Sequence, residues 1–92
     1  MTSYEFEVAA KNAVIDVIQK QYNETYPINQ INVVWMAHLL GFKKAILIDA
    51  GANQRIYEVT YNRDKDEMYV DAYEKTSNTV YANTTIDTKA HE

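Results

Sequence analysis

Residues 55–75 carry the clearest pattern in the chain, two runs of alternating apolar and polar side chains separated by a short polar segment. Alternation with a period of two is typical of a strand with one buried face. If Asn62 pairs with Glu67 across a four-residue turn, the two runs form a β-hairpin with two different faces. The face expected against a core carries Tyr57, Val59, Tyr61, Met68, Val70 and Ala72, and the other carries Ile56, Glu58, Thr60, Tyr69, Asp71 and Tyr73.

The N-terminal segment has the pattern of an amphipathic helix. Thr2 and Glu5 have the spacing of a capping box, which predicts that the helix begins there, and residues 23–27 are expected to end it. At about 100° per residue, the predicted core face consists of Phe6, Ala9, Ala10, Ala13, Val14, Val17 and Gln21.

A second apolar strip lies on a flank of the same predicted helix. Its members are Tyr4, Val8, Ile15, Ile18 and Tyr22. Either they cover the sheet edge or pack under the following loop, or they form a dimer or partner surface, since contiguous exposed apolar patches usually mark interaction sites.

Residues 31–40 and 44–49 are rich in β-branched and aromatic side chains and predict two further strands, although residues 36–40 are equally compatible with a helix. Their nearly continuous apolar character indicates central strands buried on both faces, or strands with one face buried beneath an oligomer. Residues 50–54 are expected to be a loop. The predicted fold is α+β, one N-terminal helix packed on a four-stranded antiparallel meander sheet. We expect one domain over residues 1–81 and a mobile tail over residues 82–92.

Composition excludes several classes of protein. The chain has 92 residues, a net charge of −4, no cysteine and two histidines, so disulfides, thiolate nucleophiles and Cys- or His-rich metal sites are not expected. A clustered positive field for duplex nucleic acid is missing as well. The first residues lack the pattern of a signal peptide, and no apolar run approaches the roughly 20 residues of a membrane helix. We therefore expect a cytoplasmic protein without a cofactor or a membrane partner.

Two sets of side chains are candidates for chemistry. Glu58 and Asp71 stand opposite each other in the predicted hairpin, which suits acid–base chemistry or a metal, or else a solvated acidic pair relieved by Arg55 or Lys75. His38 lies in an apolar run without a nearby nucleophile or ligand and is expected to be a hydrogen-bonded structural residue. No catalytic, metal-binding or cofactor-binding residue is predicted.

A nucleic-acid interface is the alternative to a protein interface. Trp35, Tyr69 and Tyr73 could stack on the bases of a single strand. Lys43 and Lys44 follow a glycine but lack the longer glycine-rich cradle of a phosphate loop, so a basic groove is missing.

The chain resembles an uncharacterised family of small proteins from phages and prophages of Gram-positive bacteria. The resemblance spans roughly residues 31–80, and residue 63, an arginine, stands where that pattern has glycine. The residues that carry it are Val33-Val34-Trp35, Lys44-Ala45, Tyr57-Glu58-Val59-Thr60-Tyr61-Asn62, Asp64-Lys65, Glu67, Tyr69-Val70-Asp71 and Tyr73-Glu74-Lys75.

The resemblance implies a non-enzymatic phage accessory protein that acts by protein–protein binding in the bacterial cytoplasm, for example as an inhibitor of a host defence system, as anti-CRISPR proteins are. The alternative is a nucleic-acid-binding regulator of early phage functions. We expect a homodimer that also binds a host or phage protein. The candidate interaction surface is Tyr4, Val8, Ile15, Ile18, Tyr22, Tyr69 and Tyr73.

Overall fold

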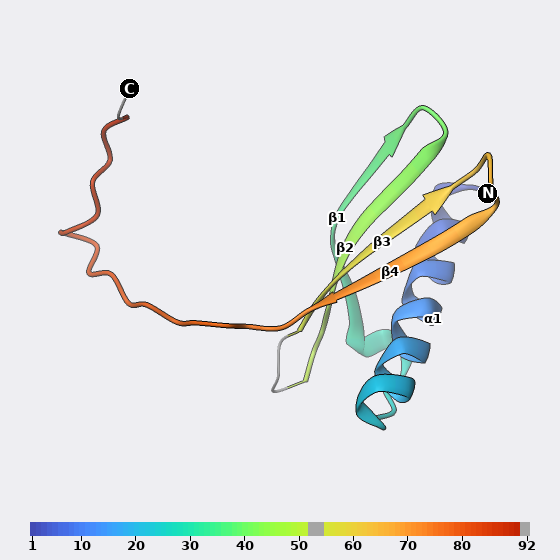
Figure 1. The fold of residues 1–92 in the computed structure, drawn as a ribbon, viewed down its shortest axis with the longest axis horizontal. Helices are drawn as coiled ribbons and strands as arrows, with labels where there is room; N and C mark the ends of the chain where they lie inside the picture. The colour runs from blue at the N-terminus through green and yellow to red at the C-terminus, as the bar shows by residue number, and fades with distance from the viewer. Residues whose placement is uncertain (52–54, 91–92) are drawn as a thin grey trace.

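A computed structural model describes residues 1–51 and 55–90 and shows one helix packed on one sheet (Figure 1). The elements are α1 (Ser3–Tyr22), the short 3-10 helix η1 (Ile28–Gln30), β1 (Ile31–Leu39), β2 (Phe42–Asp49), β3 (Ile56–Asn62) and β4 (Glu67–Tyr73). The sheet is antiparallel with strand order β1-β2-β3-β4. This confirms the predicted α+β meander. We call the sheet face that α1 covers the inner face, and the opposite one the outer face.

The start of α1 is a capping box, as predicted. The backbone N–H of Glu5 donates to Oγ1 of Thr2 at 3.1 Å, and the backbone N–H of Thr2 donates to Oε1 of Glu5 at 2.8 Å. These hydrogen bonds with Thr2 hold the pKa of the Glu5 carboxyl below its usual value. The helix ends at Asn23, whose φ of 53° is the left-handed conformation common at helix C-termini.

The buried side of α1 differs in part from the predicted one. The fully buried helix residues are Phe6, Ala10, Val14 and Ile18, whereas Gln21 is exposed. Residues four apart advance about 40° around a helix, so this row turns gradually around α1. That course keeps the helix in contact with a sheet that is itself twisted. Ile18 therefore belongs to the core and not to the predicted interaction strip.

The hairpin of β3 and β4 has the predicted register. Asn62 pairs with Glu67, and the inner face of the hairpin carries the six side chains predicted to face a core. In the turn, Asp66 takes the left-handed conformation with a φ of 50°. Arg63 has no positive φ, so a glycine is not required there and the departure from the family pattern leaves the turn intact.

The prediction that residues 31–40 form a central strand buried on both faces is wrong, because β1 is an edge strand. The strand continues to Leu39, so residues 36–39 are not helical. The register shifts between Val33 and Trp35, and after this bulge the inward-facing positions change from odd to even residue numbers. Val34 and Trp35 are exposed as a result. The apolar run thus comes from a bulged strand whose outer face is open.

Residues 74–90 contain no helix or strand and run away from the sheet (Figure 1). Val80 and Tyr81 are exposed in this segment. The radius of gyration is 16.2 Å, compared with about 12 Å for a compact chain of this length. The predicted mobility of residues 82–92 stays a prediction, and residues 91–92, like residues 52–54 of the predicted loop, lie outside the described part.

Candidate functional site: the outer face of the sheet

The outer face of the sheet is open over all four strands. The strand pairing aligns its side chains in four rows, each running from β1 to β4. The rows are Asn32, Ile48, Ile56, Tyr73; then Trp35, Ile46, Glu58, Asp71; then Ala37, Lys44, Thr60, Tyr69; and finally Leu39, Phe42, Asn62, Glu67. No part of α1 reaches this side of the sheet (Figure 1).

Large apolar side chains on this face are about half exposed. The exposed fraction is 48% for Trp35, 42% for Phe42, 47% for Ile56 and 51% for Tyr73. An antiparallel sheet commonly turns one face to water, but that face is then mainly polar. Here apolar and aromatic residues occupy solvent-facing positions that are normally polar or charged. An exposed apolar patch of this kind is typical of an interaction surface.

The charges on the outer face are few and are largely acidic. Lys44 lies 3.2 Å from Glu58, while Glu58 and Asp71 are direct cross-strand neighbours, as predicted. Lys44 from β2, and not the predicted Arg55 or Lys75, supplies the compensating cation. Asp71 makes no ion pair with the described residues. Glu58 is therefore held in an ion pair between β2 and β3, and Asp71 is exposed beside it.

The predicted interaction residues lie on two separate sides of the molecule. Tyr69 and Tyr73 are on the outer face with exposed rings. Of the helix strip, Tyr4 is 71% exposed, whereas Ile15 and Tyr22 pack partly against the core. Most of the apolar side chains of the helix strip therefore pack within the molecule, which was one of the two alternatives for this strip.

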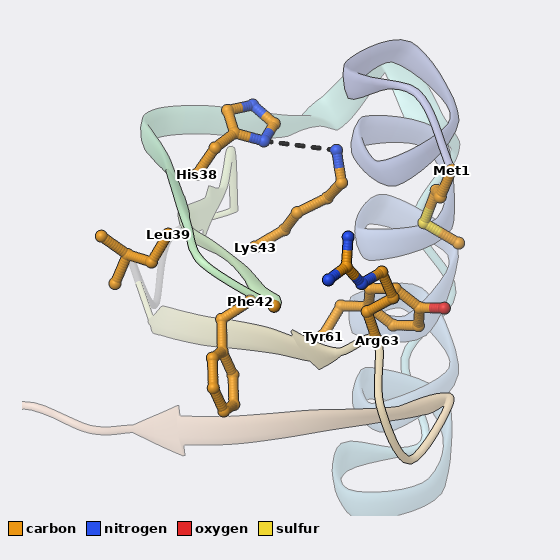
Figure 2. A pocket seen from close by; sticks show the side chains of 8 residues that line it. Met1, His38, Leu39, Phe42, Lys43, Tyr61 and Arg63 are labelled. Atoms are coloured by element: carbon orange, nitrogen blue, oxygen red, sulfur yellow. Dashed lines mark hydrogen bonds between the residues drawn. The ribbon is translucent and has the colours of Figure 1, made fainter.

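A pocket of about 290 Å³ lies at the turn end of the β1–β2 hairpin, where His38 lies near Lys43 and the start of α1 (Figure 2). Nε2 of His38 is 3.1 Å from Oγ of Ser3, and Nζ of Lys43 donates to Nδ1 of His38 at 3.3 Å. Because Lys43 can only donate, Nδ1 is an acceptor and the imidazole proton resides on Nε2. His38 in this tautomer cannot take a proton from Ser3, so the pair is not an activated nucleophile.

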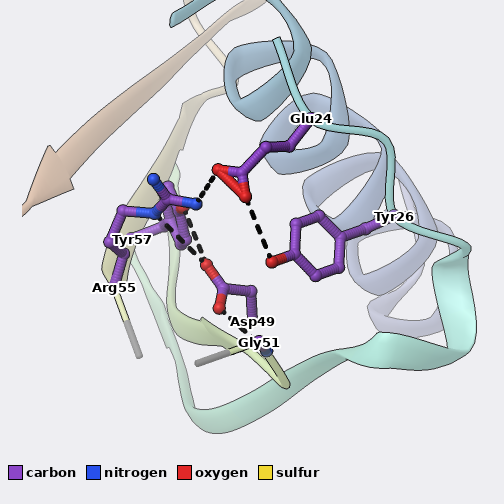
Figure 3. Close-up of polar contacts among 6 residues, drawn as sticks. All are labelled: Glu24, Tyr26, Asp49, Gly51, Arg55 and Tyr57. Atoms are coloured by element: carbon purple, nitrogen blue, oxygen red, sulfur yellow. Dashed lines mark hydrogen bonds and ion pairs between the residues drawn. The ribbon is translucent and has the colours of Figure 1, made fainter. Parts of the chain in front are cut away.

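A buried polar cluster fastens the C-terminal end of α1 to the sheet (Figure 3). The guanidinium of Arg55 donates to Glu24 at 2.6 Å and lies 3.6 Å from Oδ2 of Asp49. Asp49 is almost fully buried and also accepts hydrogen bonds from the Tyr57 hydroxyl at 3.0 Å and from the Gly51 backbone N–H at 3.1 Å. Buried charges in proteins are tolerated when they are paired in this way.

The pKa values in this cluster shift in the directions expected for a structural network. Burial, together with the hydrogen bond to Asp49, raises the pKa of the Tyr57 phenol well above its usual value. Burial alone would lower the pKa of Arg55, but the hydrogen bond to Glu24 and the neighbouring negative charges outweigh it and raise the pKa. The shifts keep the proton on both Tyr57 and Arg55 at neutral pH. The contacts of the cluster position the backbone around Asp49 and Arg55.

Two further features are absent from residues 1–51 and 55–90. No three carboxylate or imidazole side chains come together there as a metal site would require. No described helix has the length and apolarity needed to cross a membrane.

Sequence reasoning missed half of the outer face. Phe42 lay outside the predicted strands, and Ile46 and Ile48 on β2 were expected to be buried on both faces of the sheet or beneath an oligomer, but all three point away from α1. The signal was present in the register, since Ile46 and Ile48 pair with Glu58 and Ile56, which were predicted to face outward. Extending the hairpin pattern to the neighbouring strand would have placed them on the open face.

The fold and this surface define a two-layer α+β domain with an uncovered apolar sheet face. The chain belongs to the family of unknown function DUF6275, whose model matches residues 7–83. That match extends ten residues beyond the end of β4 and includes the exposed pair Val80 and Tyr81. Neither the curated proteins nor the solved structures contain a match to the chain.

Proposed function

We propose that this protein is a non-enzymatic binding module and that the outer face of its sheet is a protein-binding surface. The observation that carries the proposal is the set of half-exposed aromatic and aliphatic side chains that extends from Trp35 on β1 to Tyr73 on β4. Tyr and Trp are enriched at protein interfaces because they combine a large apolar area with a hydrogen-bonding group. A sheet face is also rigid, so little conformational freedom is lost on binding.

The biological setting comes from the resemblance to small phage and prophage proteins. In that setting the module acts in the bacterial cytoplasm on a host or phage protein, and inhibition of a host defence system, as in anti-CRISPR proteins, is one such role. The small size, the net charge of −4 and the open apolar face of the sheet support such a role.

Single-stranded nucleic acid is the second candidate for the outer face. Trp35, Tyr69 and Tyr73 all lie on this face with exposed rings, which favours base stacking. The charges argue against it, because Glu58 and Asp71 repel phosphate and the nearby Lys44 is already paired with Glu58. Protein binding is therefore the better supported function.

The test compares capture by the wild-type chain with capture by a matched pair of variants. Phe42→Glu places a charge on the outer face, and Val80→Glu places the same charge on the exposed segment after β4. We expect proteins that bind the outer face to be recovered with wild-type and Val80→Glu baits and lost with Phe42→Glu. Salt-sensitive binding of single-stranded DNA or RNA that Phe42→Glu abolishes would favour the second candidate. A chain that neither self-associates nor binds another macromolecule through this face would reject the proposal.

A further inference from the structure

We infer that the occupant of the outer face is a second copy of the same chain, packed face to face about a two-fold axis perpendicular to the strands. This inference rests on the proposed function, because it takes the outer face to be a protein-binding surface and names the partner. The support is the pattern of the four rows, which is complementary to itself in this one orientation.

The axis lies between the row that contains Ile46 and the row that contains Lys44. It places β1 over β1 and β4 over β4 of the second copy, with opposite strand directions. The first row then lies over the fourth row of the second copy, and the second row lies over the third. In this arrangement Ile48 faces Phe42 of the second copy, and Trp35 faces Ala37. These apolar pairs are thereby buried between the two copies, as in a stable homodimer interface, while Ile46 packs on the methylene stem of Lys44, whose ammonium group stays paired with Glu58 of its own chain.

The outward side chains of β4 add a second, polar match. They alternate between acid and tyrosine along the strand, in the order Glu67, Tyr69, Asp71, Tyr73. Reversing the strand over itself places Tyr73 opposite Glu67 and Tyr69 opposite Asp71. Each carboxylate then faces a phenol that can donate a hydrogen bond, and no two carboxylates face each other.

The hydrogen bonds within one chain leave partners free for this match. The side chains of Asp71 and Tyr73 make no hydrogen bond or ion pair with other described residues, while the Tyr69 hydroxyl donates to the Glu67 carboxylate of its own chain. In the dimer Tyr69 exchanges this bond for one to Asp71 of the second copy, and Glu67 gains the Tyr73 hydroxyl. On β3, Glu58 faces the hydroxyl of Thr60 of the second copy. The ion pair between Glu58 and Lys44 of the same chain is retained.

The other face-to-face arrangement, with the two-fold axis parallel to the strands, is disfavoured by the same rows. It would place β1 over β4 of the second copy. Trp35 would then face Asp71 and Leu39 would face Glu67, so two carboxylates without an ion pair to a described residue would be desolvated against apolar side chains. Burying a charge without a partner is strongly unfavourable. Charge complementarity therefore selects the perpendicular axis.

The dimensions of the face suit a dimer. Strands of seven residues spaced as in ordinary sheets span about 23 Å by 19 Å, or about 440 Å² in projection. Large side chains standing above the sheet raise the accessible area toward the ~800 Å² per partner of a standard interface. Two sheets stacked at about 10 Å, with mean strand directions within about 30° of each other, form an ordinary sandwich core.

The main test is the mass of the full chain in solution. Light scattering or sedimentation equilibrium should give about twice the monomer mass of 10.6 kDa. Phe42→Glu should weaken the dimer about thirtyfold or more, as expected for an aromatic hot-spot residue that faces Ile48 of the second copy. Tyr4→Glu is the matched control, because Tyr4 is 71% exposed on α1 and the mass should not change. Circular dichroism confirms that each variant is folded, and Trp35→Glu replaces Phe42→Glu if that variant is not.

Cross-linking tests the orientation, and the chain has no native cysteine to interfere. The variant Glu67→Cys/Tyr73→Cys places two thiols at opposite ends of β4, too far apart for a short bismaleimide to join within one chain. A covalent dimer from the double variant, but not from either single variant, supports the perpendicular axis. A covalent dimer from a single variant overturns it.

The remaining outcomes separate this inference from the proposed function. A monomer at all concentrations overturns the inference, and face-dependent capture of a different protein would still support the proposed function. A dimer that Tyr4→Glu disrupts and Phe42→Glu does not overturns the inference in favour of the helix strip. A monomer whose outer face is protected from solvent until Val80→Glu is introduced overturns it in favour of the chain's own C-terminal segment.

Discussion

The guanidinium of Arg55 lies 3.6 Å from the centre of the Tyr22 ring. Tyr22 is the last residue of α1, and Arg55 immediately precedes β3. The contact therefore joins two elements that η1, β1 and β2 separate in the sequence. A cation over an aromatic face is attracted by the ring electrons, more strongly where water is excluded. Together with Glu24 and Asp49, this contact determines where the C-terminal end of the helix rests on the sheet.

Replacing Arg55 with methionine should destabilise the fold by about 3 kcal/mol, because removal of one partner leaves Asp49 as a buried charge without a cation. Methionine keeps much of the side-chain volume, so the loss reports mainly on charge and hydrogen bonding. Urea unfolding at neutral pH measures the change in the free energy of unfolding. The control is Lys20→Met, which breaks the exposed pair with Asp16 and should cost less than about 1 kcal/mol. Similar losses in both variants would show that the Arg55 network does not stabilise the fold.

Replacing Tyr57 with phenylalanine should change how stability depends on alkaline pH. Below the ordinary tyrosine pKa of about 10, the folded and unfolded chains both keep the phenol proton, so the group makes no pH-dependent contribution. Above it, the unfolded chain loses the proton while burial and the Asp49 hydrogen bond keep it on folded Tyr57. Stability should therefore fall as pH rises above about 10, by as much as about 1.4 kcal/mol per pH unit for this one group.

The Tyr57→Phe variant should show a shallower alkaline fall than the wild type in urea unfolding between pH 9 and pH 11. The fall should not vanish, since four other tyrosines also have raised pKa values in the fold, namely Tyr22, Tyr26, Tyr61 and Tyr69. At neutral pH the variant should lose about 1–2 kcal/mol because Asp49 loses one hydrogen-bond donor. An unchanged alkaline slope would show that Tyr57 ionises normally in the folded chain.

The hairpin could be predicted from sequence because its information is local. Alternating side chains and a short polar turn define β3, β4 and their register without reference to the rest of the chain. The start of α1 is local in the same way, because Thr2 and Glu5 are three residues apart. The structure confirms both of these local features.

The buried cluster and the open face could not be predicted in full, because they depend on tertiary contacts. Glu24, Asp49 and Arg55 come from three separate segments, and each one alone has the appearance of a surface charge. Likewise, an apolar edge strand and an apolar central strand have the same composition. Only the strand order shows that Trp35 on β1 has an open side. The outer-face side chains of β3 and β4, Tyr69 and Tyr73 among them, could therefore be placed from the sequence, whereas those of β1 and β2 could not.

The rotation of α1 relative to the predicted core face is testable with a pair of neighbouring residues. Ile18 is fully buried, whereas Val17 is only partly buried. Ile18→Ala should destabilise the protein by about 3 kcal/mol, through lost burial and the cavity it leaves. Val17→Ala removes fewer buried atoms and should cost less than about 1.5 kcal/mol. Thermal or urea unfolding of both variants gives the ranking, and a larger loss at Val17 would restore the sequence-predicted face.

The close approach of Gly51 to Tyr26 gives a prediction about shape rather than charge. A Cβ atom at position 51 would run into the Tyr26 hydroxyl and would lie 3.0 Å from Cζ and 3.2 Å from Cε1 of the ring. The ring is half-buried against the core and its hydroxyl donates to Glu24, so it cannot move away freely. Gly51→Ala should therefore destabilise the fold by about 1–3 kcal/mol, as overpacking does.

A double-mutant cycle shows whether the Tyr26 ring is the cause of that loss. Tyr26→Phe removes the hydroxyl that the new Cβ would meet, at the expense of a long 3.5 Å hydrogen bond to Glu24. Gly51→Ala should consequently be less destabilising in the Tyr26→Phe background than in the wild type, with a coupling of about 1 kcal/mol. Equal losses in the two backgrounds would mean that alanine acts at position 51 through the backbone and not through the ring. Urea unfolding of the four proteins under one condition measures the coupling directly, because the remaining contacts of Gly51 are common to all of them.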